Sequence, residues 1–161
     1  MATPAELESQ LLSVDRSYYN PVFGYRVTKT GDIASAPDML FDVVGRCLIT
    51  LMVAEVSSVV ATSTSMSINT STNDLVISAS TQITTAAAGT LYIVSGDLGL
   101  GFNAGGAKSV DGAVLDVGTI APFLMNDDAI EQNVNSAGTG TLDWTLYYWP
   151  LEINAVVTAA A

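Results

Sequence analysis

The sequence predicts an all-β fold from Tyr25 to the end of the chain, arranged as a sandwich or a barrel. Valine, isoleucine and threonine are abundant there, and β-branched side chains fit a pleated strand better than a helix. Turn signals recur about every eight to twelve residues, the spacing that many short strands require. No alternation of strands with helices is visible, which argues against a doubly wound parallel sheet.

Residues 1–24 differ from the rest, so we expect an N-terminal arm followed by one β domain over residues 25–161. Thr3, Pro4 and Glu6 have the pattern of a helix start, with a hydroxyl cap, a proline at the first helical position and a carboxylate that completes a capping box. The arm is therefore predicted to open with a short helix.

The expected helix places Leu7 and Leu11 near one face, and so short a helix needs a surface to dock on. The apolar and aromatic segment 18–23 follows and is interrupted by Pro21, which predicts an extended conformation. Two interpretations of the arm stay open: it docks on another protein, or it packs on its own domain.

The pattern of β-branched runs between turn signals predicts a series of strands. Their expected ranges are Gly24–Lys29, Met39–Val44, Arg46–Val60, Ser65–Asn69, Asp74–Ser78, Gln82–Thr85, Thr90–Ser95, Ala113–Val117 and Thr141–Trp149. The run Arg46–Val60 is apolar on both faces, as in a strand covered on each side, although a buried helix has the same period.

The segment Thr141–Trp149 has large aromatic residues on both of its alternating faces. One face carries Leu142, Trp144, Leu146 and Tyr148, and the other carries Asp143, Thr145, Tyr147 and Trp149. The first face is expected to fill the core. The second is either an interface, with Tyr147 and Trp149 as its anchors, or part of an aromatic core with two sides.

The amino-acid composition excludes many catalytic and metal-binding functions. The chain has 161 residues, no histidine and one cysteine, which excludes Ser-His-Asp and Cys-His nucleophile systems, imidazole metal sites and a disulfide framework. Sixteen acidic and five basic residues give a net charge of −11, which disfavours binding to nucleic acid. No signal peptide or membrane-spanning run is visible, so a soluble protein made in a cytoplasm is expected.

Two motifs suggest a ligand but lack the required spacing. The glycine-rich segment 96–109 places Lys108 and Ser109 one position too late for a phosphate-binding loop, and a turn follows where a helix is needed. The segment Asn126–Glu131 could offer oxygen ligands to calcium, but it lacks the spacing of an EF-hand and is expected to be a solvated acidic loop. No enzyme activity, catalytic residue, cofactor or metal is therefore expected.

Several segments occur in an order that matches a known family. They are Leu48–Val56, Ala61–Ile68, Ala88–Tyr92, Asn103–Gly105, Val114–Ile120, Gly140–Glu152 and the tail Thr158–Ala161. Over most of residues 25–161 the chain resembles small structural proteins of tailed bacteriophages, in the class of capsid decoration or cement proteins. The strand at 140–152 is the most specific of these segments, whereas the arm and the Asn126–Glu131 segment depart from the pattern.

The resemblance implies a virion protein without chemistry, an antiparallel β-sandwich of the jelly-roll kind that forms a homotrimer on the outer surface of the capsid. Its expected partners are the major capsid protein and other copies of itself, with no membrane or nucleic acid. We expect two sets of contact residues: Leu7, Leu11, Tyr18, Tyr19 and Phe23 of the arm toward the capsid or a neighbouring copy, and Tyr147 and Trp149 at the subunit interface.

Two other functions stay open from the sequence. The chain could be a phage tail or fibre component whose aromatic surface binds a host saccharide. It could also be a small enzyme that acts through carboxylates alone, which would require a concave site with a raised-pKa acid.

Overall fold

The computed structural model describes residues 19–20, 22–33, 37–61, 64–94, 122–136 and 138–161. Nine strands and no helix lie in this part of the chain, so the all-β prediction is confirmed. They are β1 (Tyr19–Asn20), β2 (Gly24–Asp32), β3 (Asp38–Ser58), β4 (Ser65–Thr70), β5 (Val76–Gln82), β6 (Leu91–Val94), β7 (Phe123–Val134), β8 (Thr141–Pro150) and β9 (Val156–Ala159). The described residues accordingly hold no helix that is long and apolar enough to cross a bilayer.

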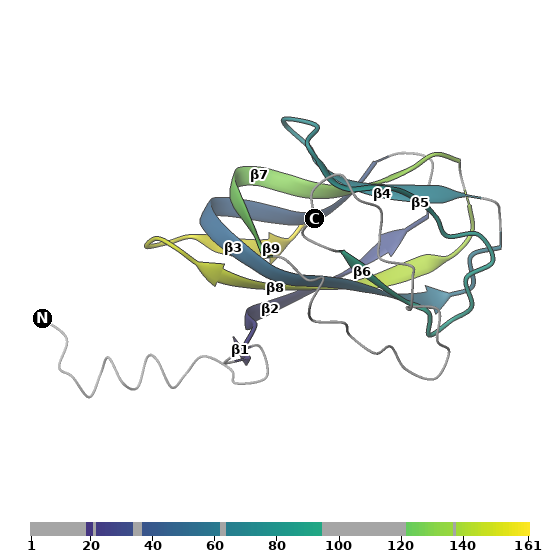
Figure 1. The fold of residues 1–161 in the computed structure, drawn as a ribbon, viewed down its shortest axis with the longest axis horizontal. Coiled ribbons are helices and arrows are strands. Elements are labelled where there is room, and N and C mark those ends of the chain that lie inside the picture. Colours follow the sequence, from purple (N-terminus) through teal and green to yellow (C-terminus); the bar gives the residue numbers. More distant parts are fainter. Residues whose placement is uncertain (1–18, 21, 34–36, 62–63, 95–121, 137) are drawn as a thin grey trace, which may run out of the picture.

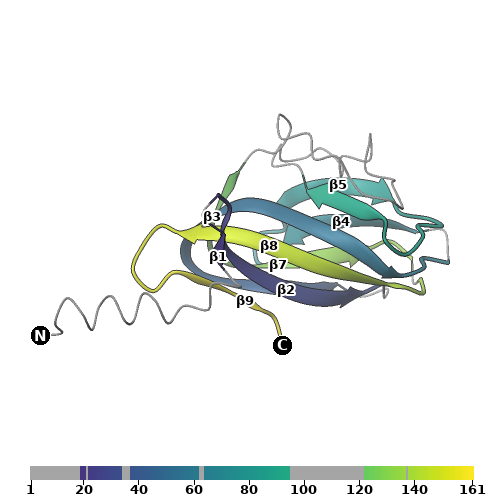
Figure 2. The same ribbon diagram turned by 90° about the horizontal axis from the view of Figure 1, so that it is seen from below.

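All strand pairs are antiparallel, and the main order across the sheet is β1-β2-β8-β3-β7-β4-β5. Figure 2 shows β2, β8 and β3 running side by side, with the short strand β1 at one end of β2. The strands β6 and β9 pair only with β3. Strand order, which the sequence left open, is therefore organised around β3.

The long strand β3 belongs to two groups of strands (Figure 1). Its first part pairs with β7 on one edge and with β9 on the other, whereas its later part pairs with β8 and β6. One continuous strand thus joins the group β9-β3-β7-β4-β5 to the group β1-β2-β8-β3-β6. Its length of 21 residues is what allows it to serve both.

The two groups face each other across a common core. Trp144 of β8 is fully buried, and its indole N–H donates a hydrogen bond of 2.9 Å to Gln132 Oε1 of β7, although β8 and β7 are separated by β3 in the strand order. Gln132 Nε2 donates in turn to the carbonyl oxygen of Asp32, at 2.6 Å. A Cβ atom added at Gly31 would lie 2.9 Å from Gln132 Oε1, so the glycine leaves room for this amide. These contacts join the two groups of strands through the core.

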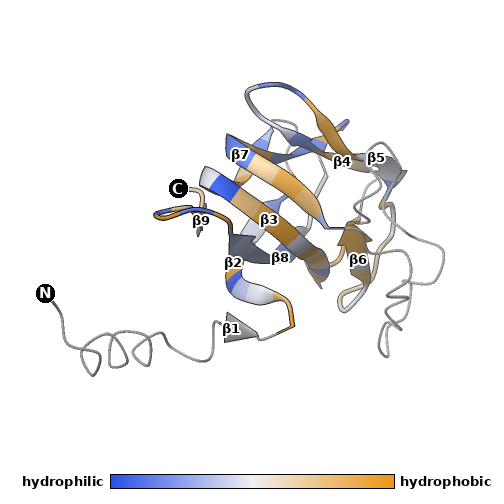
Figure 3. Ribbon diagram, turned by 60° about the vertical axis from the view of Figure 1, so that its left-hand side comes forward, coloured by the Kyte–Doolittle hydropathy of each residue, from blue (hydrophilic) through white to orange (hydrophobic). Residues whose placement is uncertain are grey.

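The hydrophobic side chains follow the same plan. Figure 3 shows strongly hydrophobic residues along the later part of β3 and on β6, which pairs with that part of β3. On β8 the four residues predicted to face the core, Leu142, Trp144, Leu146 and Tyr148, are all buried. The alternation predicted for this strand is confirmed, and the strand ends at Pro150.

Three expectations about strand boundaries are wrong. The predicted strands Met39–Val44 and Arg46–Val60 are parts of the single strand β3. The acidic segment Asn126–Glu131 is not a loop but lies inside β7, where Met125, Ile130 and Gln132 point to the core. Residues 83–85 lie beyond the end of β5 rather than in a separate strand with Gln82, and β9 has no counterpart among the predicted strands.

Other expectations fall outside the described residues. They are the short helix with Leu7 and Leu11, the aromatic residue Tyr18, the strand Ala113–Val117 and the glycine-rich segment 96–109.

Candidate interaction surface

The outer face of β8 changes character along the strand. Near its start, Asp143 is exposed and its carboxylate accepts a hydrogen bond of 2.6 Å from the Thr30 hydroxyl on β2. Near its end, Tyr147 and Trp149 are only partly buried. A polar half and an aromatic half therefore share one side of the same strand.

Residues 22–24 pack on the aromatic half. The ring of Phe23 lies against that of Tyr147, with 5.6 Å between the centroids and 51° between the planes. The hydroxyl of Thr50 lies within hydrogen-bonding distance of the carbonyl oxygens of both Phe23 and Tyr147. Gly24 adopts a φ of +97°, and a Cβ there would lie 2.2 Å from the Tyr148 carbonyl oxygen. The absence of a side chain at Gly24 thus allows the chain to enter β2 close to β8.

A row of apolar side chains continues across the neighbouring strands. Leu48 of β3 is paired with Trp149 of β8 on one side and with Leu124 of β7 on the other. Directly opposed residues in antiparallel strands lie on the same face, so the three side chains are neighbours. Leu124 is 68% exposed. Together with Phe23 and Tyr147 they form what we call the outer apolar surface.

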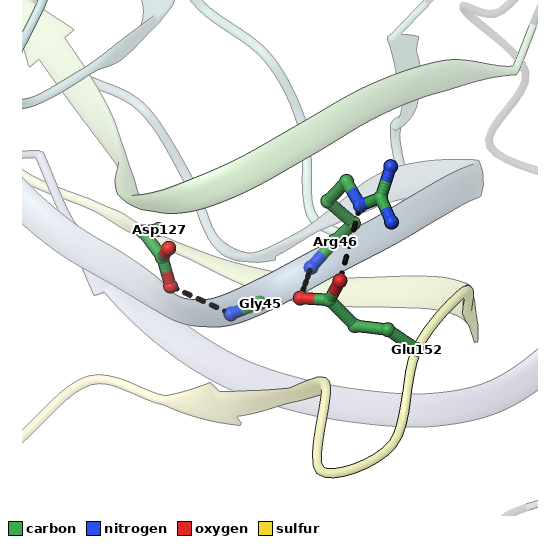
Figure 4. Close-up of polar contacts among 4 residues, drawn as sticks. All are labelled: Gly45, Arg46, Asp127 and Glu152. Carbon is green, nitrogen blue, oxygen red and sulfur yellow. Dashed lines mark hydrogen bonds and ion pairs between the residues drawn. The ribbon is translucent and has the colours of Figure 1, made fainter.

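Next to this surface β3 changes neighbours, and two carboxylates fix the change (Figure 4). Gly45 has a φ of +69° and its amide donates a hydrogen bond of 2.7 Å to Asp127 Oδ1 of β7. The next amide, that of Arg46, donates to Glu152 Oε1 at 3.0 Å, and Arg46 Nε donates to Glu152 Oε2 at 3.1 Å. Two consecutive amides that leave the β7 ladder at this irregularity thus regain acceptors.

The charge distribution at this bend has one clear consequence for titration. The Arg46 amide and guanidinium hold the pKa of Glu152 below its ordinary value. Glu152 is the carboxylate that ties the turn between β8 and β9 to β3, and Leu151 N–H donates to the Arg46 carbonyl oxygen at 2.9 Å in the same place. The turn is therefore held by both backbone and side-chain contacts.

The acidic residues of β7 serve the fold. Asp128 accepts hydrogen bonds from the amides of Thr72 and Ala129 and from Asn73 Nδ2, so that it holds the turn between β4 and β5. Burial acts to raise the pKa of Asp128, but these hydrogen bonds outweigh it and the pKa is lowered. In the described part of the chain, no group of three acidic or cysteine side chains is placed to hold a metal ion.

Burial favours the neutral forms of three titratable groups in the core. Burial raises the pKa of the Cys47 thiol, and the nearby Glu152 acts in the same direction. Burial also raises the pKa of the phenols of Tyr92 and Tyr148. A thiol that stays protonated is a poor nucleophile, so Cys47 behaves as a small core residue.

The structure brings together some of the residues predicted as contact sites. Phe23 of the predicted arm and Tyr147 of the predicted interface touch each other, and Trp149 lies in the same surface. Tyr19 lies in β1, paired with Tyr25 of β2. Leu7, Leu11 and Tyr18 lie outside the described residues.

Two residues of the outer apolar surface were not identified from the sequence. Leu48 was part of a run that is apolar on both faces, so its direction could not be read from the period. Leu124 lies in β7, which like β9 has no counterpart among the predicted strands. An alternation of Leu124 with the inward residues Phe123 and Met125 was the available signal, but it is too short to be decisive.

No family model, no curated protein and no solved structure matches this chain.

Proposed function

We propose that this chain is a structural virion protein that binds the outer surface of a tailed-phage capsid and stabilises the shell as a homotrimer. The observation that carries the proposal is the outer apolar surface, in which partly covered aromatic and aliphatic side chains from three strands and from residues 22–24 share one face. Aromatic anchors surrounded by polar residues are typical of protein–protein interfaces.

The charge of the molecule supports a protein partner. Five basic residues against sixteen acidic ones give a surface that packaged DNA would repel, whereas the outside of a shell imposes no such penalty. The resemblance of residues 25–161 to decoration proteins points to a phage capsid as that partner. The major capsid protein is accordingly the proposed binding partner.

The proposed mechanism is mechanical rather than chemical. The outer apolar surface is buried against the shell or a neighbouring copy, and residues of the arm, with Leu7, Leu11, Tyr18 and Tyr19 as its anchors, extend the contact. On a symmetric shell, many copies each make weak contacts, and together these contacts stabilise the shell. Each bound copy raises the effective concentration for the next contact. Shell disassembly then requires many such contacts to break.

The test measures binding of the purified chain to expanded, empty heads of the phage that encodes it. Trp149→Ala removes an anchor of the surface, and deletion of residues 1–18 removes most of the arm while β1 and Phe23 stay in place. We expect each change to reduce head binding at least tenfold. The matched control is Thr145→Ala, which lies on the same face of β8 in its polar half.

Unchanged binding of both variants would contradict the proposed surface. Absence of the chain from the head, together with binding to a glycan array that Trp149→Ala abolishes, would instead favour a tail or fibre protein that recognises a host saccharide.

A further inference from the structure

An apolar pocket of about 280 Å³ opens on the surface between the starts of β5 and β7. Its lining includes Thr70, Leu75, Ile77, Phe123, Leu124 and Met125. Ile77 and Met125 are buried, whereas Leu75 and Leu124 are 62% and 68% exposed, so the lining extends from the core to solvent. An apolar cavity of ~150 Å³ already accommodates a benzene-sized group. A leucine or phenylalanine side chain therefore fits this pocket.

The pocket is continuous with the outer apolar surface. Leu124 belongs to both, because it is paired with Leu48 of β3, and Leu48 is paired in turn with Trp149 of β8. Protein interfaces place their strongest anchor side chains in well-packed pockets within a larger apolar patch. A protein that covers the outer apolar surface also reaches the rim of the pocket, which favours a protein segment over a free small molecule as the occupant.

The charged groups around the pocket are mostly negative. Asp74 is exposed directly beside Leu75, and its Oδ1 accepts a hydrogen bond of 2.9 Å from Asn69 Nδ2, whereas the described contacts give Oδ2 no donor. The other charged groups on β7 and on the adjoining part of β3 include Asp42, Asp127, Asp128 and the ion pair between Arg46 and Glu152. The ion pair is neutral as a unit, so the carboxylates outside it leave a negative field. This field attracts a basic group of a partner to the rim of the pocket.

One polar group in the wall has a donor left for an occupant. Thr70 is only 4% exposed, and its hydroxyl accepts a hydrogen bond of 3.1 Å from the Leu75 amide. The described contacts include no hydrogen bond that this hydroxyl donates. Apolar walls with a small number of polar groups are typical of binding pockets. The Thr70 hydroxyl can donate to an acceptor of the entering segment, such as a peptide carbonyl oxygen.

We propose that this pocket takes an aliphatic or aromatic side chain from a protein partner, and that a lysine or arginine next to it in the partner's sequence pairs with Asp74. The proposal rests on the proposed function for the identity of the partner, whose segment then belongs to the major capsid protein. The chemistry of the occupant follows from the pocket itself. Burial of the apolar side chain supplies affinity, and the neighbouring cation selects the segment, because charges at a rim act mainly on specificity and on the rate of association.

The first test uses two short peptides as probes, N-acetyl-leucyl-arginine amide and N-acetyl-leucyl-glutamate amide, in a methyl NMR titration of the full chain. The arginine peptide should shift the methyl signals of Leu75 and Leu124 and should bind about threefold more tightly than the glutamate peptide, as expected for one exposed ion pair. Asp74→Asn should remove this difference. Asparagine tolerates the φ of +50° at this position and keeps an acceptor for Asn69. No shift at the two leucines, or equal binding of both peptides to the unchanged chain, would overturn the proposal.

The second test measures binding to expanded, empty heads. Leu75→Asp places a charge at the exposed rim and should weaken head binding about tenfold, the effect of one lost anchor. Val59→Asp is the matched control, because Val59 is 55% exposed but lies beyond the end of β3, and it should leave binding unchanged. If Trp149→Ala weakens head binding and Leu75→Asp does not, the proposed function stands and this proposal fails. If the unchanged chain does not bind heads, the proposed function fails, and the peptide titration alone decides on the pocket.

Discussion

The two faces of β8 carry similar side chains in different surroundings. On the inner face Trp144 is fully buried, and its indole N–H is satisfied by Gln132 across the core. On the outer face Trp149 is only partly buried, next to Leu48 and Gly24. Both faces are rich in aromatic residues, so composition does not distinguish them. What distinguishes them is that the inner face is completed by the domain, whereas the outer face leaves large side chains partly exposed.

The largest expected effect separates the two tryptophans. Trp144→Ala removes a fully buried ring and leaves Gln132 Oε1 without its donor, so we expect a loss of about 3–5 kcal/mol in the free energy of unfolding. Trp149→Ala should cost less, about 1–2 kcal/mol, because part of the ring is exposed to solvent in the folded protein. Urea unfolding of both variants measures the difference. Equal losses would mean that the outer face is as much a part of the core as the inner one.

The second prediction concerns the polar link inside the core. Gln132→Met introduces an apolar side chain of similar length, which can bond neither the Trp144 indole N–H nor the Asp32 carbonyl oxygen. An unsatisfied buried donor or acceptor costs about 1–3 kcal/mol, and we expect a loss of that size in thermal or urea unfolding. Asn133→Met on the adjacent residue, which bonds only Glu131 among the described contacts, is the control and should change little.

The sequence predicted the faces of β8 because an alternation of period two needs no knowledge of the partner strands. It could not predict that β3 is continuous. Gly45 interrupts the β-branched run and looks like a turn, and only Asp127 and Glu152, which are distant in sequence, supply acceptors for the amides at this point. The same holds for β7, where the core residues Met125 and Ile130 are five positions apart and therefore break the period of two, with Asp127 at a φ of +34° between them.

The outer apolar surface, too, could be predicted from the sequence only in part. Tyr147 and Trp149 follow from the alternation of a single strand, so their shared outward direction was expected. Leu48 and Leu124 join them only through the register of β3 with its two neighbours, which depends on the whole fold. Contacts between residues distant in sequence therefore mark the limit of what the periodic pattern could reveal.

The third prediction tests how firmly residues 22–24 complete the outer face. Phe23→Ala removes the ring that packs on Tyr147. An aromatic pair contributes about 0.5–1.5 kcal/mol beyond its buried area, so a loss of about 1–2 kcal/mol in stability and a more solvent-exposed Tyr147 are expected. Unfolding and tyrosine hydrogen-exchange NMR would measure both. An unchanged free energy of unfolding would mean that the contact of Phe23 with Tyr147 does not stabilise the domain. The whole outer face would then be available to a partner.

The smallest effect is expected just beyond the end of β8, at Glu152, where a carboxylate in contact with solvent ties the turn between β8 and β9 to Arg46 of β3. Its pKa is lowered in the folded protein by the Arg46 amide and guanidinium, so its contribution to stability is complete above the unfolded-state pKa and is lost as the pH falls through the folded value. Glu152→Gln should therefore lower stability at about pH 6 and have a diminishing effect toward about pH 3. Unfolding curves of both proteins across this range measure the difference. The Gly45 and Arg46 amides should exchange faster in the variant at the higher pH, and faster exchange of the Trp144 indole instead would place the effect in the core rather than at the turn.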